Sequence, residues 1–409
     1  MLKRRWFRFT LWGVGGLLVI ALAGFLWLRN SPYWAGITLF AENYRVENFR
    51  GMDQVFPYRT VARTGDVWAF GENPVPLPVT YDHDGEQKDL AEFLDRTVTT
   101  GLLVVRDGEI VHEEYRLGAD ETSPFTSWSM AKSVVSALIG IAVAEGDIDS
   151  IQDPIGKYVP SLTGTAYENV PIEDVLTMSS GVAFNEDYDD PLSDVNMLFI
   201  DFPMGTPLNE TIAGLEKARE PGVFNDYISA DTIALGLVLE GATGVPANEY
   251  LETRLWGPMG AEADAFWSVS RSDEVIPLCC LNATLRDYAR FGRLYLEGGA
   301  RDGAQIVPAD WVEQSVNPTA AHLQPGDNPA SSWTFGYGYK WWVPEDPQGD
   351  FLAIGIWGQY IYVDPARDIV IVKTSADPEF DANDHESVAA FRSIAATVTD
   401  GRPGDADGV

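Results

Sequence analysis

The chain has 409 residues, and its 61 acidic against 28 basic residues give it a formal net charge of -33. This charge excludes a protein that binds nucleic acid or anionic lipid through a basic surface. An acidic surface suits cationic or neutral substrates, with adaptation to high salt and plain solubility as the alternatives.

The N-terminal segment, residues 1–30, joins a basic start to an apolar run. Lys3, Arg4, Arg5 and Arg8 precede Phe9–Leu28, which contains no charged residue. A helix of that length spans about 30 Å, enough to cross a bilayer. We therefore expect a single-pass anchor in a bacterial inner membrane, with the body on the periplasmic side. The alternative is a signal peptide cleaved near Ala21–Ala23, which would release a secreted protein.

Residues 31–80 are rich in proline, glycine and aromatic side chains without clear periodicity, so we expect an extended lead-in. The main domain is expected at 81–400. It begins with a predicted hairpin, in which Leu102–Arg106 and Glu109–Tyr115 flank an Asp107-Gly108 turn.

The main chemical signal is Ser129-Met130-Ala131-Lys132, the one S-x-x-K sequence in the chain. It opens the almost wholly apolar run Ser133–Glu145, which predicts a buried helix ended by Gly146. Residues three apart on a helix share a face, so Lys132 should reach the Ser129 hydroxyl. A buried lysine with a lowered pKa can take a serine proton, beside a helix N-terminus that stabilises developing negative charge. The alternative is a helix-capping serine with a surface lysine.

Residues 147–281 predict short helices and loops, which we interpret as a mostly helical insertion. Helices are predicted at Pro171–Leu176, Ser229–Glu240 and Thr284–Glu297. Cys279 and Cys280 are adjacent. Because adjacent cysteines do not readily form an ordinary disulfide, we expect no structural disulfide.

The C-terminal part predicts an antiparallel meander of three strands, at Phe335–Val343, Phe351–Val363 and Ile369–Thr374. A closing helix is expected at Ser387–Thr397, and a disordered acidic tail at 401–409. Strands at both ends with helices between them indicate an α/β (α+β) fold: an antiparallel sheet flanked by helices, with a helical insertion, preceded by one transmembrane helix.

Two further segments carry candidate site residues. In the loop Pro221–Ser229, a lysine ammonium beside Tyr227 would stabilise its phenolate and let it act as a base. The alternatives are an aromatic packed on the core for Tyr227 and a helix cap for Ser229. The second segment, Gly355–Gln359, has two glycines inside a predicted strand. Such glycines indicate either a close approach that supplies a second oxyanion N–H or a β-bulge.

Four motifs follow one another in a recognisable order. They are Ser129-x-x-Lys132, Tyr227-x-Ser229, Asn282 to Gly292, and Gly355-x-x-Gly358-Gln359. Together, over about residues 48–391, they resemble the serine hydrolases related to class C β-lactamases, and especially the 6-aminohexanoate-dimer hydrolase branch. The resemblance implies a β-lactamase/penicillin-binding-protein-like fold and hydrolysis of small amides or esters through an acyl-enzyme. It implies no metal and no organic cofactor.

The resemblance also implies roles for single residues. Ser129 is the expected nucleophile, and Lys132 and Tyr227 share the acid and base work. The backbone amides of Ser129 and Gln359 are expected to form the oxyanion hole. Substrate contacts are expected from Tyr188, Ser229, Asn282, Trp357 and Gly358. The alternative for Tyr188 is an exposed loop aromatic.

Two departures from class C β-lactamases argue against antibiotic hydrolysis. Tyr227-Ile228-Ser229 stands where those enzymes carry Tyr-x-Asn, and Ile356-Trp357-Gly358 where they carry Lys-Thr-Gly. The missing lysine would contact the β-lactam carboxylate. Lys373-Thr374-Ser375 imitates that motif, but it follows the Asp364-Pro365 turn, so we expect it on the next strand.

Other classes of function fit less well. A Ser-His-Asp hydrolase would show a G-x-S-x-G elbow, which the chain lacks, and none of its four histidines has an evident partner. A metalloenzyme would show an H-x-x-x-H sequence or a spaced Cys/His cluster. The remaining alternative is a penicillin-binding-like protein with little or no catalysis that recognises peptidoglycan or peptides. No motif specifies an oligomeric state.

Overall fold

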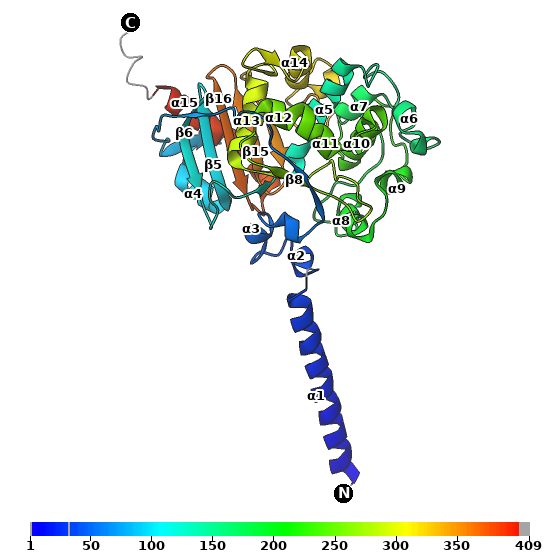
Figure 1. Cartoon of the computed structure of the whole chain (residues 1–409). Coiled ribbons are helices and arrows are strands. Elements are labelled where there is room, and N and C mark those ends of the chain that lie inside the picture. The colour runs from blue at the N-terminus through cyan, green and yellow to red at the C-terminus, as the bar shows by residue number, and fades with distance from the viewer. Residues whose placement is uncertain (1, 32, 401–409) are drawn as a thin grey trace.

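The computed structural model describes residues 2–31 and 33–400, so the tail predicted at 401–409 lies outside the described residues. In Figure 1, a long helix, α1 (Leu2–Arg29), projects from a rounded body. The body joins a large sheet on one side to a mostly helical region on the other. This division confirms the predicted sheet core with a helical insertion.

The large sheet has eight strands in the order β12-β13-β14-β15-β16-β5-β6-β2. The predicted hairpin is present as β5 and β6, and the antiparallel pairing of β16 with β5 joins it to the C-terminal strands. The pair of β2 with β6 is parallel. The strands are β2 (Gly71–Glu72), β5 (Thr99–Arg106), β6 (Glu109–Tyr115), β12 (Gly336–Tyr337), β13 (Trp342–Val343), β14 (Phe351–Gly355), β15 (Gln359–Asp364) and β16 (Ile369–Ser375).

Two of the three predicted C-terminal strands were wrong in extent. Phe335–Val343 is a hairpin of β12 and β13, in which Lys340 has a φ of 63°. Phe351–Val363 is a hairpin of β14 and β15, with φ values of 64° and 78° at Trp357 and Gly358. Positive φ at two successive residues reverses the chain. Both turns contain apolar residues, so the amino-acid composition of these segments did not indicate that the chain turns there.

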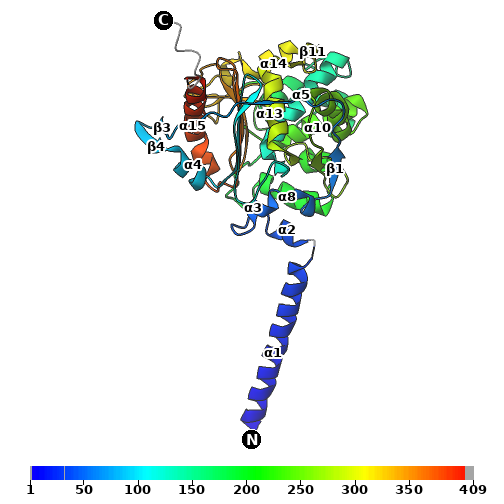
Figure 2. The same ribbon diagram turned by 60° about the vertical axis from the view of Figure 1, so that its left-hand side comes forward.

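Two helices, α13 (Leu285–Leu296) and α15 (Phe380–Asp400), cover opposite faces of the sheet (Figure 2). Tyr360 and Tyr362 of β15 pack on Phe391 of α15, whereas Ile361 between them faces Gly292 of α13. Successive side chains of a strand point to opposite faces, which explains this alternation. With both faces covered, β16 is buried along its whole length, and its first four residues, Ile369 to Val372, are all apolar.

The helical region is built around α5 (Ala131–Glu145), which packs against α10 (Ser229–Thr243). Gly146 ends α5 in the left-handed conformation, as predicted. The other helices of the body are α4 (Leu90–Arg96), α6 (Ile155–Tyr158), α7 (Ile172–Leu176), α8 (Asp194–Met204), α9 (Leu208–Ala213), α11 (Ala247–Leu251), α12 (Gly257–Met259) and α14 (Ala309–Val316).

The lead-in is less extended than predicted. It contains α2 (Tyr33–Ile37), α3 (Arg45–Asn48) and a short 3-10 turn at Met52–Gln54. Its strand β1 (Tyr58–Val61) joins a second sheet of order β1-β8-β9-β7, so the lead-in is part of the body. The remaining strands are β3 (Thr80–His83), β4 (Glu86–Asp89), β7 (Phe125–Thr126), β8 (Ala265–Ser268), β9 (Leu281–Ala283), β10 (Ala300–Arg301) and β11 (Ala304–Gln305).

Two helical segments of the described chain are strongly apolar. By length and composition, the segment that could cross a membrane is Trp128–Glu145, but it is 78% buried inside the body and is a core helix. The second is Val14–Arg29 of α1, which is shorter and lies near the N-terminus. Its apolar side chains are exposed, as Leu18 and Ile20 show. An apolar N-terminal helix of this kind fits either an anchor or a signal sequence.

The cysteine prediction was wrong, because Cys279 and Cys280 form a disulfide. The backbone turns sharply between them, with a φ of 68° at Cys280, and both residues are buried. The general rule for disulfides assumes partners distant in sequence, and a strained turn between neighbours is an exception to it.

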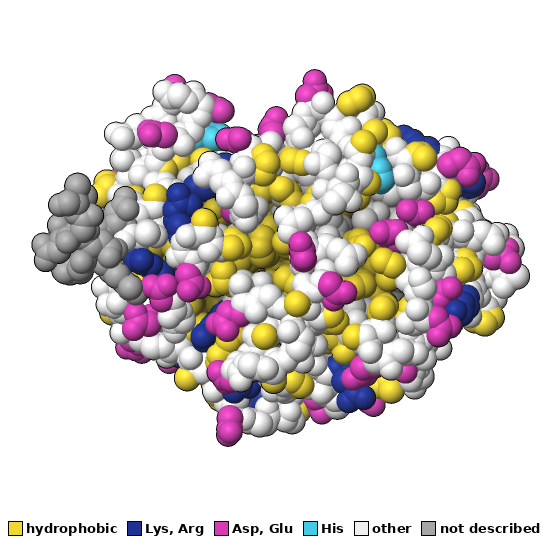
Figure 3. Space-filling model, turned by 90° about the horizontal axis from the view of Figure 1, so that it is seen from above, with side chains coloured by type: hydrophobic (Ala, Val, Ile, Leu, Met, Phe, Trp, Pro, Cys, Tyr) yellow, Lys and Arg dark blue, Asp and Glu magenta, His cyan; other side chains and the backbone are white. Residues whose placement is uncertain are grey.

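Figure 3 shows the face of the body that is turned away from α1. Acidic side chains are spread across this face, and basic ones are dispersed rather than gathered into one patch. A nucleic-acid backbone would find no continuous basic surface on this face.

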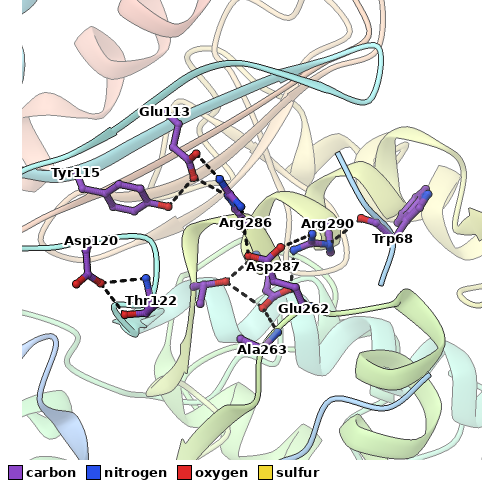
Figure 4. Close-up of polar contacts among 11 residues, drawn as sticks. Trp68, Glu113, Tyr115, Asp120, Thr122, Glu262, Ala263, Arg286, Asp287 and Arg290 are labelled. Atoms are coloured by element: carbon purple, nitrogen blue, oxygen red, sulfur yellow. Dashed lines mark hydrogen bonds and ion pairs between the residues drawn. The ribbon is translucent and has the colours of Figure 1, made fainter. Parts of the chain in front are cut away.

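A buried polar network holds α13 to the rest of the body (Figure 4). Asp287 accepts hydrogen bonds from the backbone of Glu262 (2.8 Å) and Ala263 (3.1 Å) and from the Arg290 guanidinium (2.9 Å). Arg290 also donates to the Trp68 carbonyl at 2.9 Å. The network therefore ties the lead-in and the end of the insertion to the helix that supports the sheet.

We expect Asp287→Ala to lower the free energy of unfolding by about 3–5 kcal/mol, because it removes the buried partner of Arg290 Nη1 and the acceptor of two backbone N–H groups, and leaves Arg290 paired with Glu262 alone. Glu297→Ala is the matched control, since it breaks an exposed pair with Arg293 on the same helix and should cost less than about 1 kcal/mol. Denaturant titration of both variants measures the difference. Equal losses would show that burial of the Asp287 pair does not matter.

Candidate active site

Ser129 lies where a 3-10 turn, Trp128–Met130, leads into α5. Lys132 follows in the first turn of α5, and its Nζ lies 2.8 Å from Ser129 Oγ. The contact expected from their spacing is therefore present. Trp128 has a φ of 40°, a conformation that residues other than glycine rarely adopt. Such a conformation persists because the core holds the buried Trp128 ring in place.

Lys132 is buried, with 1% of its surface exposed, so the alternative of a surface lysine is wrong. Its Nζ donates to Ser129 Oγ (2.8 Å), Ser229 Oγ (3.2 Å) and the Leu278 carbonyl (3.1 Å). Burial lowers the pKa of Lys132 to about 8, against the charge of Glu186, which raises it. Near neutral pH, a useful fraction of Lys132 is therefore neutral and able to accept the Ser129 proton.

We expect the rate of Ser129 acylation to rise with pH. Lys132 must be neutral to act as a base, and below its pKa of about 8 the neutral fraction grows about tenfold per pH unit. Acylation should therefore increase between about pH 6 and pH 8 and level off above that range. Stopped-flow measurement of acylation by an activated ester checks this, and a rate that is flat across the range would contradict it.

Tyr227 lies beside this pair, with Lys132 Nζ 5.1 Å from its ring centroid. Its ring stacks on Trp342 at 5.2 Å. Burial and then the charge of Glu186 raise the pKa of Tyr227, whereas contact with Ser129 lowers it. The net direction is opposite to the one expected from a neighbouring ammonium. Tyr227 is thus protonated near neutral pH, and it can give a proton to a leaving group.

The end of β14 lies against the nucleophile. A Cβ on Gly355 would come within 3.0 Å of the Ser129 amide nitrogen and 2.5 Å of the Ser127 carbonyl, so only glycine fits there. The next residue, Ile356, lines the same cavity as Ser129. The backbone of Gly355 therefore lies against that of Ser129, with Ile356 next to it at the cavity.

Gln359, which was predicted to supply the second amide, does not line the cavity that contains Ser129. Gln359 is buried in β15 as the ladder partner of Gly355, and its side chain donates to the carbonyls of Trp357 (3.0 Å) and Ser375 (2.8 Å). Its role is to hold the turn between β14 and β15. The glycine that approaches Ser129 closely is Gly355 rather than Gly358.

Besides Ser229, three other expected substrate contacts do not line the cavity. Asn282 is buried in β9 and donates to the Cys280 carbonyl at 2.8 Å. Trp357 stacks on Phe40 of the lead-in at 5.7 Å. Gly358 faces Ser375 and Asp377, behind the sheet edge. Sequence order placed these residues near the site, but strand pairing and the turn direct them away from it.

The cavity itself has a volume of about 320 Å³. Half of the residues that line the cavity are apolar or aromatic, and most of the others are acidic. The lining includes Ser129, Tyr188, Tyr227, Trp333, Ile354 and Ile356, with the carboxylates of Glu186, Asp187, Asp189, Asp226, Asp381 and Asp384. Such a cavity accommodates a small organic molecule.

The loop before α8 brings Tyr188 to the cavity. The tyrosine hydroxyl donates to Glu186 Oε1 at 2.7 Å. Ser229 also contacts Glu186, through its hydroxyl to Oε1 (2.6 Å) and its backbone N–H to Oε2 (2.7 Å). Ser229 is thus the first residue of α10 rather than its cap. Glu186, for which the sequence indicated no role, lies two residues before Tyr188 in the same loop.

Lys373 lies on β16, the strand after the site, as the sequence predicted. It is buried and donates to Ser375 Oγ at 2.5 Å, and burial lowers its pKa to about 7. Lys373 does not line the cavity that contains Ser129.

Comparison with known sequences agrees with this geometry. The Beta-lactamase family profile matches residues 87–392. The 6-aminohexanoate-dimer hydrolase of Paenarthrobacter ureafaciens is 33% identical over 300 residues, which cover 72% of this chain and 76% of that protein.

Comparison with solved structures shows the same fold. A Bacillus anthracis protein provisionally named a 6-aminohexanoate-dimer hydrolase has a TM-score of 0.79 and 24% identity, over 88% of this chain and 96% of that one. A family VIII carboxylesterase has a TM-score of 0.59 and 15% identity, over 75% of this chain and 95% of the other. At these identities, the likeness concerns the fold alone.

Proposed function

This chain belongs to the beta-lactamase family, and on that premise we propose that it is a serine hydrolase of small amides or esters that works through an acyl-enzyme on Ser129. The observation that carries the proposal is the 2.8 Å contact of Ser129 Oγ with a buried lysine, at the wall of a cavity of about 320 Å³. Sequence similarity to a 6-aminohexanoate-dimer hydrolase supports the assignment as a hydrolase.

The proposed reaction follows from the positions of the groups. Neutral Lys132 takes the Ser129 proton as Oγ attacks the substrate carbonyl, and the amides of Ser129 and Ile356 stabilise the oxyanion. Tyr227 gives its proton to the leaving amine or alcohol and recovers one from Lys132. Water then attacks the acyl group on Ser129, with the same groups acting in reverse, and releases the acid.

The cavity narrows the class of substrate. Its carboxylates and the net charge of -33 disfavour anionic substrates. The end of β14 offers Ile354 and Ile356 instead of a lysine, so a β-lactam carboxylate would find no cationic partner there. Neutral or cationic amides and esters fit best, with aminohexanoate oligomers an early choice because of the Paenarthrobacter ureafaciens relative.

A short-chain p-nitrophenyl ester tests the proposal on the purified full chain. We expect a burst of p-nitrophenol and, by intact mass followed by peptide mapping, one acyl adduct on Ser129. Folded protein with neither turnover nor adduct would overturn the proposal and favour a penicillin-binding-like protein that only recognises peptidoglycan or peptides.

We further propose that α1 is retained as an anchor in the bacterial inner membrane, with the body on the periplasmic side. Its basic start and apolar run support this. So does α8, which lies with α2 at the end of the body nearest α1 (Figures 1 and 2) and exposes Ile200 and Met204. Carbonate extraction of membranes from expressing cells tests the anchor. Release into the soluble fraction with a shortened N-terminus would show signal cleavage and secretion instead.

A further inference from the structure

Glu186 occupies a central place in the site, yet the proposed reaction does not use it. Its Oε1 accepts hydrogen bonds from two hydroxyls, those of Ser229 (2.6 Å) and Tyr188 (2.7 Å). Its Oε2 accepts the Ser229 backbone N–H at 2.7 Å. The Glu186 carboxylate is thus fixed at the start of α10, and the Ser229 side chain lies between it and Lys132.

Ser229 connects this carboxylate to the lysine. A serine hydroxyl has one hydrogen, and at Ser229 that hydrogen is committed to Glu186. Only oxygen lone pairs therefore face Lys132 Nζ, 3.2 Å away. Ser229 can accept a hydrogen bond from the lysine but cannot donate one to it.

This constraint decides where the lone pair of neutral Lys132 points. A neutral amine has two N–H groups and one lone pair. Ser229 Oγ (3.2 Å) and the Leu278 carbonyl (3.1 Å) can only accept, so both N–H groups are directed to them. The third direction, toward Ser129 Oγ at 2.8 Å, is left for the lone pair. A Ser229 hydroxyl that was free to rotate would compete with Ser129 for it.

We infer that Glu186 is a positioning residue, which fixes Ser229 as an acceptor and thereby directs the Lys132 lone pair to the Ser129 hydroxyl. The inference rests on the proposed function, since it assigns Lys132 the part of the base. It goes beyond that function by giving the loop that carries Tyr188 a second task in the acylation step.

The charge of Glu186 has a separate, measurable consequence. It raises the pKa of Lys132, in opposition to burial. The other titratable groups nearby are Tyr227, whose ring lies over Nζ, and Lys340 with its partner charge Asp231. The charge of Glu186 also raises the pKa of Tyr227 and of Lys340. The response of Lys132 must therefore be read from its own assigned signal.

The test compares Glu186→Gln and Glu186→Asp with Asp194→Asn in the full chain. Asp194 also holds this loop, through a hydrogen bond from the Asn185 backbone at 2.7 Å, but it contacts neither Ser229 nor Lys132. For Glu186→Gln we expect acylation about tenfold slower or more, with its rise with pH moved about one unit lower. Glu186→Asp should restore the position of the pH profile, and Asp194→Asn should leave it in place.

A direct titration of Lys132 makes the result independent of turnover. In protein labelled at lysine ¹³Cε, with Lys132→Met identifying the signal, Glu186→Gln should lower the Lys132 pKa by about one unit. An unmoved signal, or an equal shift in Asp194→Asn, would overturn the inference. Absence of ester turnover and adduct in the wild type would instead overturn the proposed function, whatever the titration shows.

Discussion

Ser129→Ala should reduce ester turnover by about 10⁴-fold or more and abolish the acyl adduct. The substitution removes the oxygen that bonds to the acyl group. Among the described residues, the other side-chain hydroxyl that is hydrogen-bonded to Lys132 is that of Ser229, which is committed to Glu186. Steady-state kinetics and intact mass on the purified variant measure both effects.

The fold should tolerate this change. Ser129 is 7% exposed and faces the cavity, so its loss creates no new void in the core, and the free energy of unfolding should change by less than about 1 kcal/mol. Ser136→Ala is the matched control, because that hydroxyl is buried on the same helix and has no hydrogen-bond partner among the described residues. The control should keep wild-type turnover. Retained ester hydrolysis in Ser129→Ala would refute the mechanism.

Lys132→Met should slow acylation by about 10³-fold or more, because the Ser129 hydroxyl loses the base that takes its proton. Methionine is of similar length and apolar, so it fills the buried site without a charge. Since nucleophile and base act as a unit, the double variant with Ser129→Ala should be no slower than Ser129→Ala alone. Burst kinetics with the p-nitrophenyl ester provide the measurement.

Lys132→Arg distinguishes the action of Lys132 as a base from the effect of its positive charge. Arginine keeps a positive charge but does not lose its proton near neutral pH. If Lys132 acts as a base, the arginine variant should be about as slow as the methionine variant. Substantial activity in Lys132→Arg would mean that a fixed charge is sufficient, and the role assigned to neutral lysine would be wrong.

Local patterns in the sequence were sufficient for the nucleophile helix. The apolar run and Gly146 predicted α5 with its end, and the S-x-x-K spacing predicted the contact of Lys132 with Ser129. Both depend on a single helix, whose geometry relates neighbours three residues apart without reference to the rest of the chain. The Asp107-Gly108 hairpin was predicted for the same reason.

Predictions that depended on partners distant in sequence were less successful. Gln359 and Gly358 were placed in the site because a strand was expected where the chain turns between β14 and β15. One turn directs Gly355 and Ile356 to the nucleophile and Trp357 to Phe40 of the lead-in. Positive φ at a tryptophan is held by tertiary packing, which composition does not reveal.

The sequence by itself determined the family, the sheet with its helical insertion, and the pair of Ser129 and Lys132, because each is encoded by a local pattern. Only the tertiary structure decided the pKa of Lys132 and the part played by Glu186. Burial lowers that pKa, and burial is the sum of contacts from α5, α10 and the loop at Leu278. Glu186 meets Ser229 across 43 residues of chain, a contact that no local pattern encodes.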